Sequence, residues 1–383
     1  MTHDLVVAGG HVLCPATGID AAADVAIDGG RIAAIGEGLV GRERIDAAGL
    51  LVVPGLIDLH VHVYEGVSHY GVDADRYLLR RGTTTGVDVG SAGAQTFPGL
   101  RRMVIDTAQT RIYAYLHIAV EGMISVLVGE LEDIRWASVE QCVRVARANP
   151  DVIAGVKLRA GHQMVGDDPR PAIALAFEAA EELGLPLMVH VIDMKIPLPE
   201  LLARMRPNDV VTHCFHGNEG GLLDDDGRVW PEAFAARERG VLFDVGHGVG
   251  SFTWRVARAA LAQGFPPDTI SSDIHAYNCA GPVHDLPRTL SKLLHLGMPL
   301  SDVVAAATVR PAVHLAHVAP AGLGTLAAGA PGDLTLLERE RGRFALTDGE
   351  HRLSEHVTEF ATERLIARSV VRAGAVVACD EPT

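Results

Sequence analysis

Residues 54–62 carry the sequence Pro-Gly-Leu-Ile-Asp-Leu-His-Val-His, and the rest of the chain is organised around this segment. Residues 52–59 are mostly apolar and include β-branched side chains, a run short enough for a buried strand. His60 and His62 stand at its end, two residues apart, so a strand turns both imidazoles to one face. Two converging imidazoles make half of a site for a divalent metal, although two ordinary polar residues closing a strand give the same pattern.

The composition sets the class of protein. The chain has 383 residues, of which 48% are hydrophobic, so one large domain or two with a sizeable core are possible. A formal charge of −15 argues against nucleic acid or an anionic membrane as the main partner. We find neither a secretory signal nor an apolar stretch of membrane-spanning length, and the five cysteines form no Cys-x-x-Cys pair. We therefore expect a cytoplasmic protein with reduced thiols.

Both ends of the chain show the pattern of short strands. Apolar runs fill the chain before residue 52, and the Asp-Gly-Gly at 28–30 between two of them is a strong hairpin signal. Residues 332–337 and 369–377 return to this pattern. We predict a small β-sandwich module built from residues 1–52 and 325–383.

The middle of the chain, residues 53–324, alternates between strand and helix patterns. Strands are predicted at residues 52–59, 83–89, 111–118, 152–159, 186–191, 209–215, 241–247 and 269–275. Helices are predicted at residues 71–81, 98–110, 139–148, 170–183, 285–296 and 301–317, with Ser138 as an N-cap and Gly184 as a C-terminal stop. Eight βα units over about 250 residues predict a (β/α)₈ TIM barrel inserted between the halves of the β-module.

Polar side chains that can bind metal recur where these strands end. In a parallel barrel the active site is built at the carboxyl ends of the strands. A single histidine at such a position is usually a structural group, but several around one rim are hard to attribute to chance. The residues concerned are His60, His62, Lys157, His190, His213 and Asp273.

This pattern resembles the amidohydrolase superfamily over nearly the whole chain, including the split β-module. The segment at 54–62 matches the family's opening motif, and the remaining match is a lysine on strand 4, histidines on strands 5 and 6 and an aspartate on strand 8. Together they resemble the binuclear subtype, whose lysine is carboxylated. Gly-Val-Lys-Leu-Arg at 155–159 and Ser-Asp-Ile-His at 272–275 are most similar to the deacetylase-like branch related to dihydroorotases.

The resemblance implies a role for each of these residues. One divalent ion, expected to be zinc, would be held by His60, His62 and Asp273, and a second by His190 and His213. A carbamate on Lys157 would bridge the two ions, since an unmodified ammonium with a pKa of about 10.4 is repelled by them. The alternative for this lysine is a buried pair with Asp273 or another carboxylate.

The same resemblance implies hydrolysis of an amide or ester. Two metals lower the pKa of a shared water, and Asp273 would be the catalytic proton carrier to the leaving group. The sum of the charges at such a centre favours an anionic small-molecule substrate.

Substrate recognition is less visible in the sequence. Arg159 lies two residues beyond Lys157 and is a candidate for binding a carboxylate, with pairing to acidic loop residues as the alternative. We interpret Glu121 as a loop carboxylate. Further candidates for the pocket lie beyond strands 6, 7 and 8, namely His216, His247, His275, Tyr277 and Asn278.

Three functions compete on these residues. A dihydroorotase or other cyclic amidase is one, but Val-Tyr-Glu at 63–65 puts no arginine after His62, where many dihydroorotases carry one. A non-catalytic scaffold is another, disfavoured because all six metal positions are filled. We favour deacetylation of a small N-acetyl or O-acetyl carboxylic acid, either an amino or a hydroxy acid. A homo-oligomer is possible, since the outer helices of such barrels often support assembly.

Overall fold

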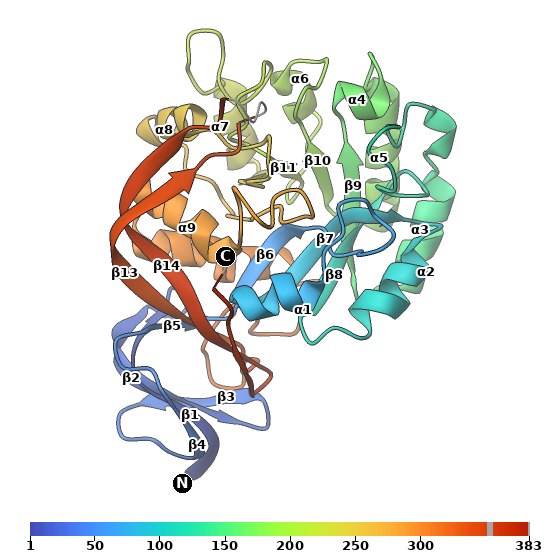
Figure 1. Cartoon of the computed structure of the whole chain (residues 1–383). Coiled ribbons are helices and arrows are strands. Elements are labelled where there is room, and N and C mark those ends of the chain that lie inside the picture. The colour runs from blue at the N-terminus through green and yellow to red at the C-terminus, as the bar shows by residue number, and fades with distance from the viewer. Residues whose placement is uncertain (351–354, 382–383) are drawn as a thin grey trace.

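The computed structural model describes residues 1–350 and 355–381. Figure 1 shows two sheets: one formed by the first strands and the last, and one that curls within a layer of helices. In the described part of the chain no helix is both long and apolar enough to cross a bilayer.

The first sheet joins the two ends of the chain. Its strand order is β15-β14-β13-β5-β1-β2-β3, with β4 paired to β1. The Asp-Gly-Gly hairpin is confirmed: β2 and β3 are antiparallel, and Gly29 and Gly30 adopt φ values of 54° and 73° that suit a tight turn. The strands are β1 (Thr2–Cys14), β2 (Ile19–Asp28), β3 (Arg31–Gly36), β4 (Val40–Asp46), β5 (Leu51–Pro54), β13 (Leu334–Thr347), β14 (Thr358–Arg372) and β15 (Ala375–Ala378).

The predicted strand at 52–59 is divided between the two sheets. Gly55 separates β5, which pairs with β1 and β13, from β6 (Leu56–Val61), which pairs with β7. A side chain at residue 55 would come within 2.3 Å of Thr84 Oγ1, so only glycine lets the backbone pass between the sheets here. Our prediction of one continuous strand is therefore wrong, although its polar end lies where we expected it.

The second sheet is parallel throughout, in the order β12-β11-β10-β9-β8-β7-β6. The predicted eighth strand, residues 269–275, forms no regular strand but bridges both edges, through Thr269 to Asp244 and through Ile274 to Val61. Asp273 has a φ of 50°, which interrupts an extended backbone. Besides β6, the strands are β7 (Thr83–Gly93), β8 (Arg111–His117), β9 (Ile153–Arg159), β10 (Leu187–His190), β11 (Val210–Thr212) and β12 (Leu242–Asp244).

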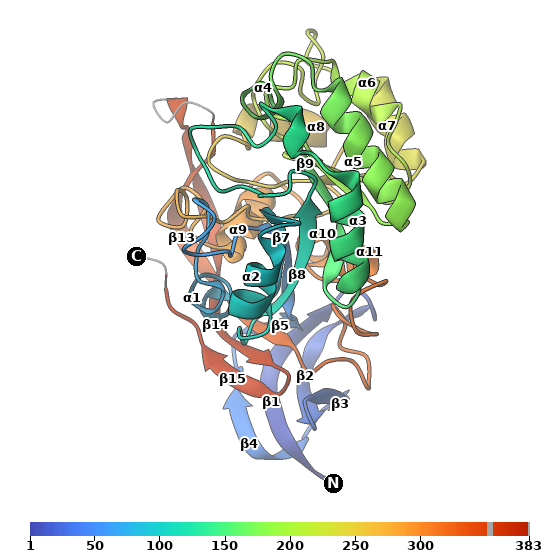
Figure 2. The ribbon, with the colours of Figure 1, turned by 90° about the vertical axis from the view of Figure 1, so that its right-hand side faces the viewer.

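Helices cover the outside of this curled sheet (Figures 1 and 2). The predicted caps are confirmed: Ser138 Oγ accepts from the Gln141 N–H at 3.3 Å, and Gly184 ends its helix with a φ of 65°. The helices are α1 (Ala74–Tyr77), α2 (Phe97–Leu100), α3 (Val139–Ala148), α4 (His162–Val165), α5 (Arg170–Leu183), α6 (Leu198–Leu202), α7 (Pro231–Glu238), α8 (Trp254–Ala262), α9 (Leu286–His295), α10 (Leu300–Ala306) and α11 (Val309–His314).

Three predicted helices are shorter or broken. The helix at 71–81 is α1 followed by a 3₁₀ turn (Leu79–Arg81), and the one at 98–110 is α2 followed by a π-helical turn that ends at Ile105. The helix at 301–317 divides into α10 and α11, because Ala307 and Thr308 leave helical geometry. Apolar spacing alone does not register such interruptions.

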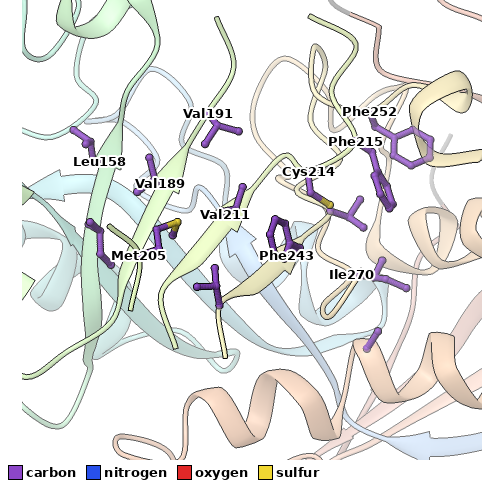
Figure 3. Close-up of a cluster of buried hydrophobic side chains, with 14 of the residues drawn as sticks. Leu158, Val189, Val191, Met205, Val211, Cys214, Phe215, Phe243, Phe252 and Ile270 are labelled. Atoms are coloured by element: carbon purple, nitrogen blue, oxygen red, sulfur yellow. The ribbon is translucent and has the colours of Figure 1, made fainter. Parts of the chain in front are cut away.

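Apolar side chains between β9–β12 and the surrounding elements fix the strand ends. Figure 3 shows Val189, Val211 and Phe243 on neighbouring strands within this cluster. All three are fully buried, as are Phe215 and Phe252 on the loops that follow β11 and β12. Close packing of this kind holds the polar residues at the strand ends in one place.

The hairpin of β13 and β14 runs alongside the body from the first sheet to the loops near α8 (Figure 1). Its end touches the loop after β12: the N–H of Gly349 donates to the carbonyl of Phe252 at 2.8 Å, and Trp254 Nε1 donates to the carbonyl of Val357 at 3.0 Å. The β-module thus supports the loop between β12 and α8, whose residues 249–251 line a cavity at the strand ends.

Candidate metal centre

A cavity of about 170 Å³ opens where the parallel strands end. It is lined by side chains from β6, β9 and β10 and from the segments that follow β11 and β12. All six residues that the sequence suggested as metal ligands line it: His60, His62, Lys157, His190, His213 and Asp273.

Three of these residues form a tight group. Nε2 of His60 lies 3.4 Å from Oδ1 of Asp273, and Nε2 of His62 lies 3.2 Å from the same oxygen. Their ligand atoms all fall within 4.8 Å of one another. Asp273 Oδ1 is buried and has no hydrogen-bond partner in the described part of the chain. Two imidazoles and an unpartnered carboxylate oxygen suit a divalent ion, so the residues present fit the metal that the resemblance implied.

The other two histidines lie beside this group. The ring centroids of His60 and His213 are 4.9 Å apart, and those of His190 and His213 are 4.5 Å apart. The four imidazoles therefore form a continuous row across the strand ends. Lys157 faces the same cavity from β9.

Hydrogen bonds on the far side of the rings fix their orientation. The hydroxyl of Thr212 donates to Asp244 Oδ2 at 2.9 Å, so it accepts from Nδ1 of His60, 2.8 Å away. Nδ1 of His213 donates to the carbonyl of Gly246 at 2.7 Å. In both neutral rings the lone pair is then on Nε2, the atom available for a metal.

His62 is held by a parallel arrangement. Its Nδ1 lies 3.0 Å from Oγ of Ser91, whose backbone N–H donates to Asp88 Oδ1 at 2.9 Å. Sequence reasoning missed Thr212, Ser91 and the carboxylates Asp88 and Asp244 behind them. The sequence signal for Asp88 and Asp244 was a carboxylate inside an otherwise apolar strand. Such a carboxylate is costly to bury unless it accepts hydrogen bonds, so it indicates donors nearby.

Burial keeps these histidines neutral. It lowers the pKa of His60, His62 and His213 well below 6.5, and the positive charge of Lys157 lowers each pKa further. For His190, burial is again the main cause of a pKa well below 6.5, and protonation of the neighbouring His213 would lower that pKa further. Neutral imidazoles near pH 7 are the form that binds a metal ion.

Lys157 is buried without a counter-charge in contact. Its Nζ has no hydrogen-bond partner among the described residues, so the alternative of a lysine paired with Asp273 does not match the structure. Burial lowers the pKa of this lysine to about 7. A substantial fraction of the side chain is therefore a neutral, nucleophilic amine at neutral pH.

Arg159 pairs with an acidic loop residue, the alternative given above for its role, and also lies in the cavity wall. Its Nη1 donates to Oε1 of Glu130, a buried loop carboxylate, at 2.9 Å. Its Nε is buried with no partner in the part of the chain that the structure describes. Sequence reasoning missed Tyr70, whose ring lies 5.4 Å from the guanidinium carbon and stacks on His62 at 5.2 Å.

The remaining candidates differ in position. His275 lines the cavity, whereas Tyr277 is 51% exposed and lies outside its lining. His216 is buried behind the wall, and His247 accepts from the buried amine of Lys292 at 2.7 Å. Asn278 is also outside the lining, and its side chain donates to the carbonyl of Asp273 at 2.7 Å. Glu121 borders a separate surface depression, as expected of a loop carboxylate.

Comparison with known proteins identifies the family, although no family model matches the sequence. A deacetylase of Agrobacterium fabrum is 38% identical over 294 residues, which cover 76% of this chain and 72% of that protein. A deacetylase of Enterococcus faecalis is 32% identical over 371 residues, 95% of this chain and 96% of that protein. The chain belongs to the amidohydrolase superfamily.

Solved structures of this superfamily confirm the fold. A crystal structure of an adenine deaminase superposes with a TM-score of 0.88 at 30% identity, covering 98% of this chain and 100% of the other. A crystal structure of a dihydroorotase gives a TM-score of 0.88 at 32% identity, with 99% and 98% covered. The predicted TIM barrel with a β-sandwich module is thus confirmed, and this amidohydrolase is a metal-dependent hydrolase.

Proposed function

We propose that this amidohydrolase removes the acetyl group from a small N-acetyl or O-acetyl carboxylic acid. The observation that carries the proposal is Arg159, a cation in the wall of the same cavity that holds the metal-binding residues. Its guanidinium has five N–H donors and Glu130 engages one nitrogen, so donors remain for a substrate carboxylate. The relatives named deacetylases, matched over most of their length, support the same reaction.

In this proposal the cavity holds two divalent ions, expected to be zinc. His60, His62 and Asp273 would hold one, His190 and His213 would hold the other, and a carbamate on Lys157 would supply oxygen ligands to both. When bound, such ions supply hydroxide near neutral pH and polarise the scissile carbonyl. The unpartnered Nζ of Lys157 and Oδ1 of Asp273 support this assignment.

The chain's own residues then handle binding and proton transfer. Arg159 fixes the substrate carboxylate and so places the acetyl group over the histidines. Asp273 accepts the proton of the attacking water on Oδ2 and delivers it to the leaving nitrogen or oxygen. Without metal, burial raises the pKa of Asp273 to about 6, and a divalent ion on its Oδ1 would lower that pKa again. A side chain at Gly248 would come within 2.5 Å of that Oδ2, so glycine keeps the oxygen approachable.

A dihydroorotase-like cyclic amidase is the second candidate, favoured by the similar solved structure of a dihydroorotase. One experiment separates the two. The zinc-loaded protein is assayed against N-acetyl and O-acetyl amino and hydroxy acids of both configurations, and against dihydroorotate and other cyclic amides. We expect acetate release from the open-chain acids and no ring opening. Turnover of cyclic amides alone would overturn the deacetylase proposal.

A further inference from the structure

A buried imidazole on the strand beside Lys157 has no role in the chemistry above. His117 ends β8 and is completely buried. Its Nδ1 accepts a hydrogen bond from the backbone N–H of Ala119 at 2.9 Å. That nitrogen therefore carries no proton, and the proton of the ring is on Nε2. Nε2 is buried and has no hydrogen-bond partner in residues 1–350 and 355–381.

This N–H group lies next to the side chain of Lys157. The two residues are partners in the parallel pairing of β8 and β9, which turns both side chains to the same face of the sheet. Both also border the space above Gly90, whose φ is +90°. A side chain at Gly90 would meet Lys157 Cγ at 2.7 Å and His117 Cδ2, the atom bonded to Nε2, at 2.9 Å.

The side chains of His117 and Lys157 therefore flank one space, and each has a buried nitrogen without a hydrogen-bond partner among the described residues. The ammonium form of Lys157 has only donors, and the Nε2–H group of His117 is also a donor. An ammonium on Lys157 therefore leaves the Nε2–H group without an acceptor. Carboxylation changes the balance. The lone pair of Nζ forms a bond to the carbon of carbon dioxide, one C=O electron pair moves to oxygen, and a proton is lost from Nζ to solvent water. The resulting carbamate carries two acceptor oxygens, whereas the ammonium form of Lys157 has only donors.

We infer that His117 is a positioning residue that donates its Nε2–H to the carbamate of Lys157. The inference rests on the proposed carboxylation of that lysine and adds a partner that selects and orients the modified form. A hydrogen bond to an ionised acceptor is stronger than one between neutral groups, and it is stronger still in a buried site.

The test measures carboxylation itself and does not depend on turnover. Protein prepared without metal is given a fixed concentration of Zn²⁺ and is then titrated with ¹³C-labelled bicarbonate. The carbamate carbon is followed by ¹³C NMR, and bound zinc is measured alongside it. His117→Phe keeps a flat ring but removes the donor. We expect it to need about tenfold more bicarbonate than the unchanged protein for half-maximal zinc uptake.

Two further variants make the result specific. His117→Gln places an amide N–H near the position of Nε2 and should restore the bicarbonate requirement to within about threefold. His314→Phe is the matched control, because it removes another buried imidazole, one that is hydrogen-bonded to Tyr115 and lies outside the lining of the cavity. It should leave the bicarbonate requirement unchanged. Equal requirements in His117→Phe and the unchanged protein would overturn the inference.

Failure of the inference and failure of the proposed carboxylation give different results. A ¹³C carbamate signal in the unchanged protein, with no effect of His117→Phe, overturns only the role of His117. Absence of the signal in the zinc-loaded unchanged protein overturns both. If His117→Phe does not fold, ¹⁵N-histidine labelling of the unchanged protein provides the answer: the His117 Nε2–H proton should move downfield when zinc and bicarbonate are added together. An unmoved resonance would contradict the hydrogen bond.

Discussion

The two walls of the cavity differ in how many of their polar atoms have hydrogen-bond partners within the fold. On the imidazole side, formed by His60, His62 and His213, every Nδ1 has a hydrogen-bond partner. On the lysine side, formed by Lys157, Arg159 and Glu130, each side chain has a buried polar atom without a partner among the described residues. Folding therefore fixes the orientation of these three rings. The lysine side has donors and acceptors left for groups that do not belong to the chain, which we propose to be a carbamate and a substrate carboxylate.

The lysine side is broken most completely by Lys157→Met. We expect zinc content to fall from about two equivalents to less than about one, and turnover to fall by at least about 10⁴-fold, because the charge stabilisation provided by the metals is lost with them. Zinc analysis and acetate release measure both effects. Lys292→Met is the matched control, since Lys292 is equally buried but bonds His247 and the carbonyl of Pro282. Full zinc content in Lys157→Met would contradict the proposed bridge.

Asp273 contacts the imidazole side and carries the proposed proton. Asp273→Asn keeps an oxygen ligand but cannot accept a proton, so we expect most of the zinc to remain while kcat falls by about 10³-fold. Kinetics at saturating substrate and zinc analysis on the same sample check this. A kcat near that of the unchanged protein would remove Asp273 as the proton carrier.

Arg159 tests whether the lysine side recognises a carboxylate. Arg159→Met should lower kcat/KM for an acetylated acid by about 10²-fold, mainly through KM, because a charge-assisted contact is lost. The matching comparison is the methyl ester of the same substrate, which offers no anion. The variant and the unchanged protein should cleave that ester with similar KM values. An equal loss on acid and ester would indicate that Arg159 only supports the pocket.

The positions of the metal-binding residues could be predicted because they depend on local rules. A strand that ends in a polar residue places it at the rim of a parallel barrel, and this holds for Lys157 on β9 and His190 on β10 alike. The groups behind them could not be predicted. Thr212 reaches His60 only through the register of strands far apart in sequence, which no local pattern fixes.

The long hairpin shows a second limit. We predicted only residues 332–337 and 369–377 as strands, because β13 continues into the alternating charges of residues 338–343. There Arg339 pairs with Glu363 and Arg364 with Glu340 across the two strands. These cross-strand ion pairs stabilise a part of the sheet in which apolar residues do not alternate with polar ones. The apolar pattern in the sequence therefore ends before the strand does.

The hydroxyl of Thr212 tests whether the imidazole side is set by its hydrogen bonds. Thr212→Val has nearly the same shape but cannot link His60 to Asp244, so the ring loses its fixed tautomer. We expect zinc affinity to fall by about tenfold to 100-fold, with kcat of the fully loaded protein little changed. Competition with a fluorescent chelator gives the affinity. Thr269→Val also removes a hydroxyl from Asp244, 2.7 Å away, but touches no imidazole and serves as the control.

The smallest expected effect is a pH dependence of stability in the metal-free protein. Burial lowers the pKa of the cavity histidines well below 6.5, so the unfolded chain binds more protons than the folded chain once the pH falls below that value. The stability that neutral histidines contribute is therefore present above about pH 6.5 and is lost as the pH falls. Burial raises the pKa of Asp58 and Glu121 to about 7 and that of Asp88 and Asp273 to about 6, which acts in the opposite direction.

Burial also lowers the pKa of His117, His216 and His247, so the buried histidines outnumber these acids and their effect should prevail. We expect the free energy of unfolding of the metal-free protein to fall by at least about 1 kcal/mol between about pH 7 and pH 5.5, measured by urea denaturation. Zinc should steepen the dependence, because the protons that enter the imidazoles displace the metal. A metal-free protein that becomes more stable as the pH falls through this range would mean that the buried acids dominate. The imidazole side would then owe its neutral rings to bound metal and not to the fold.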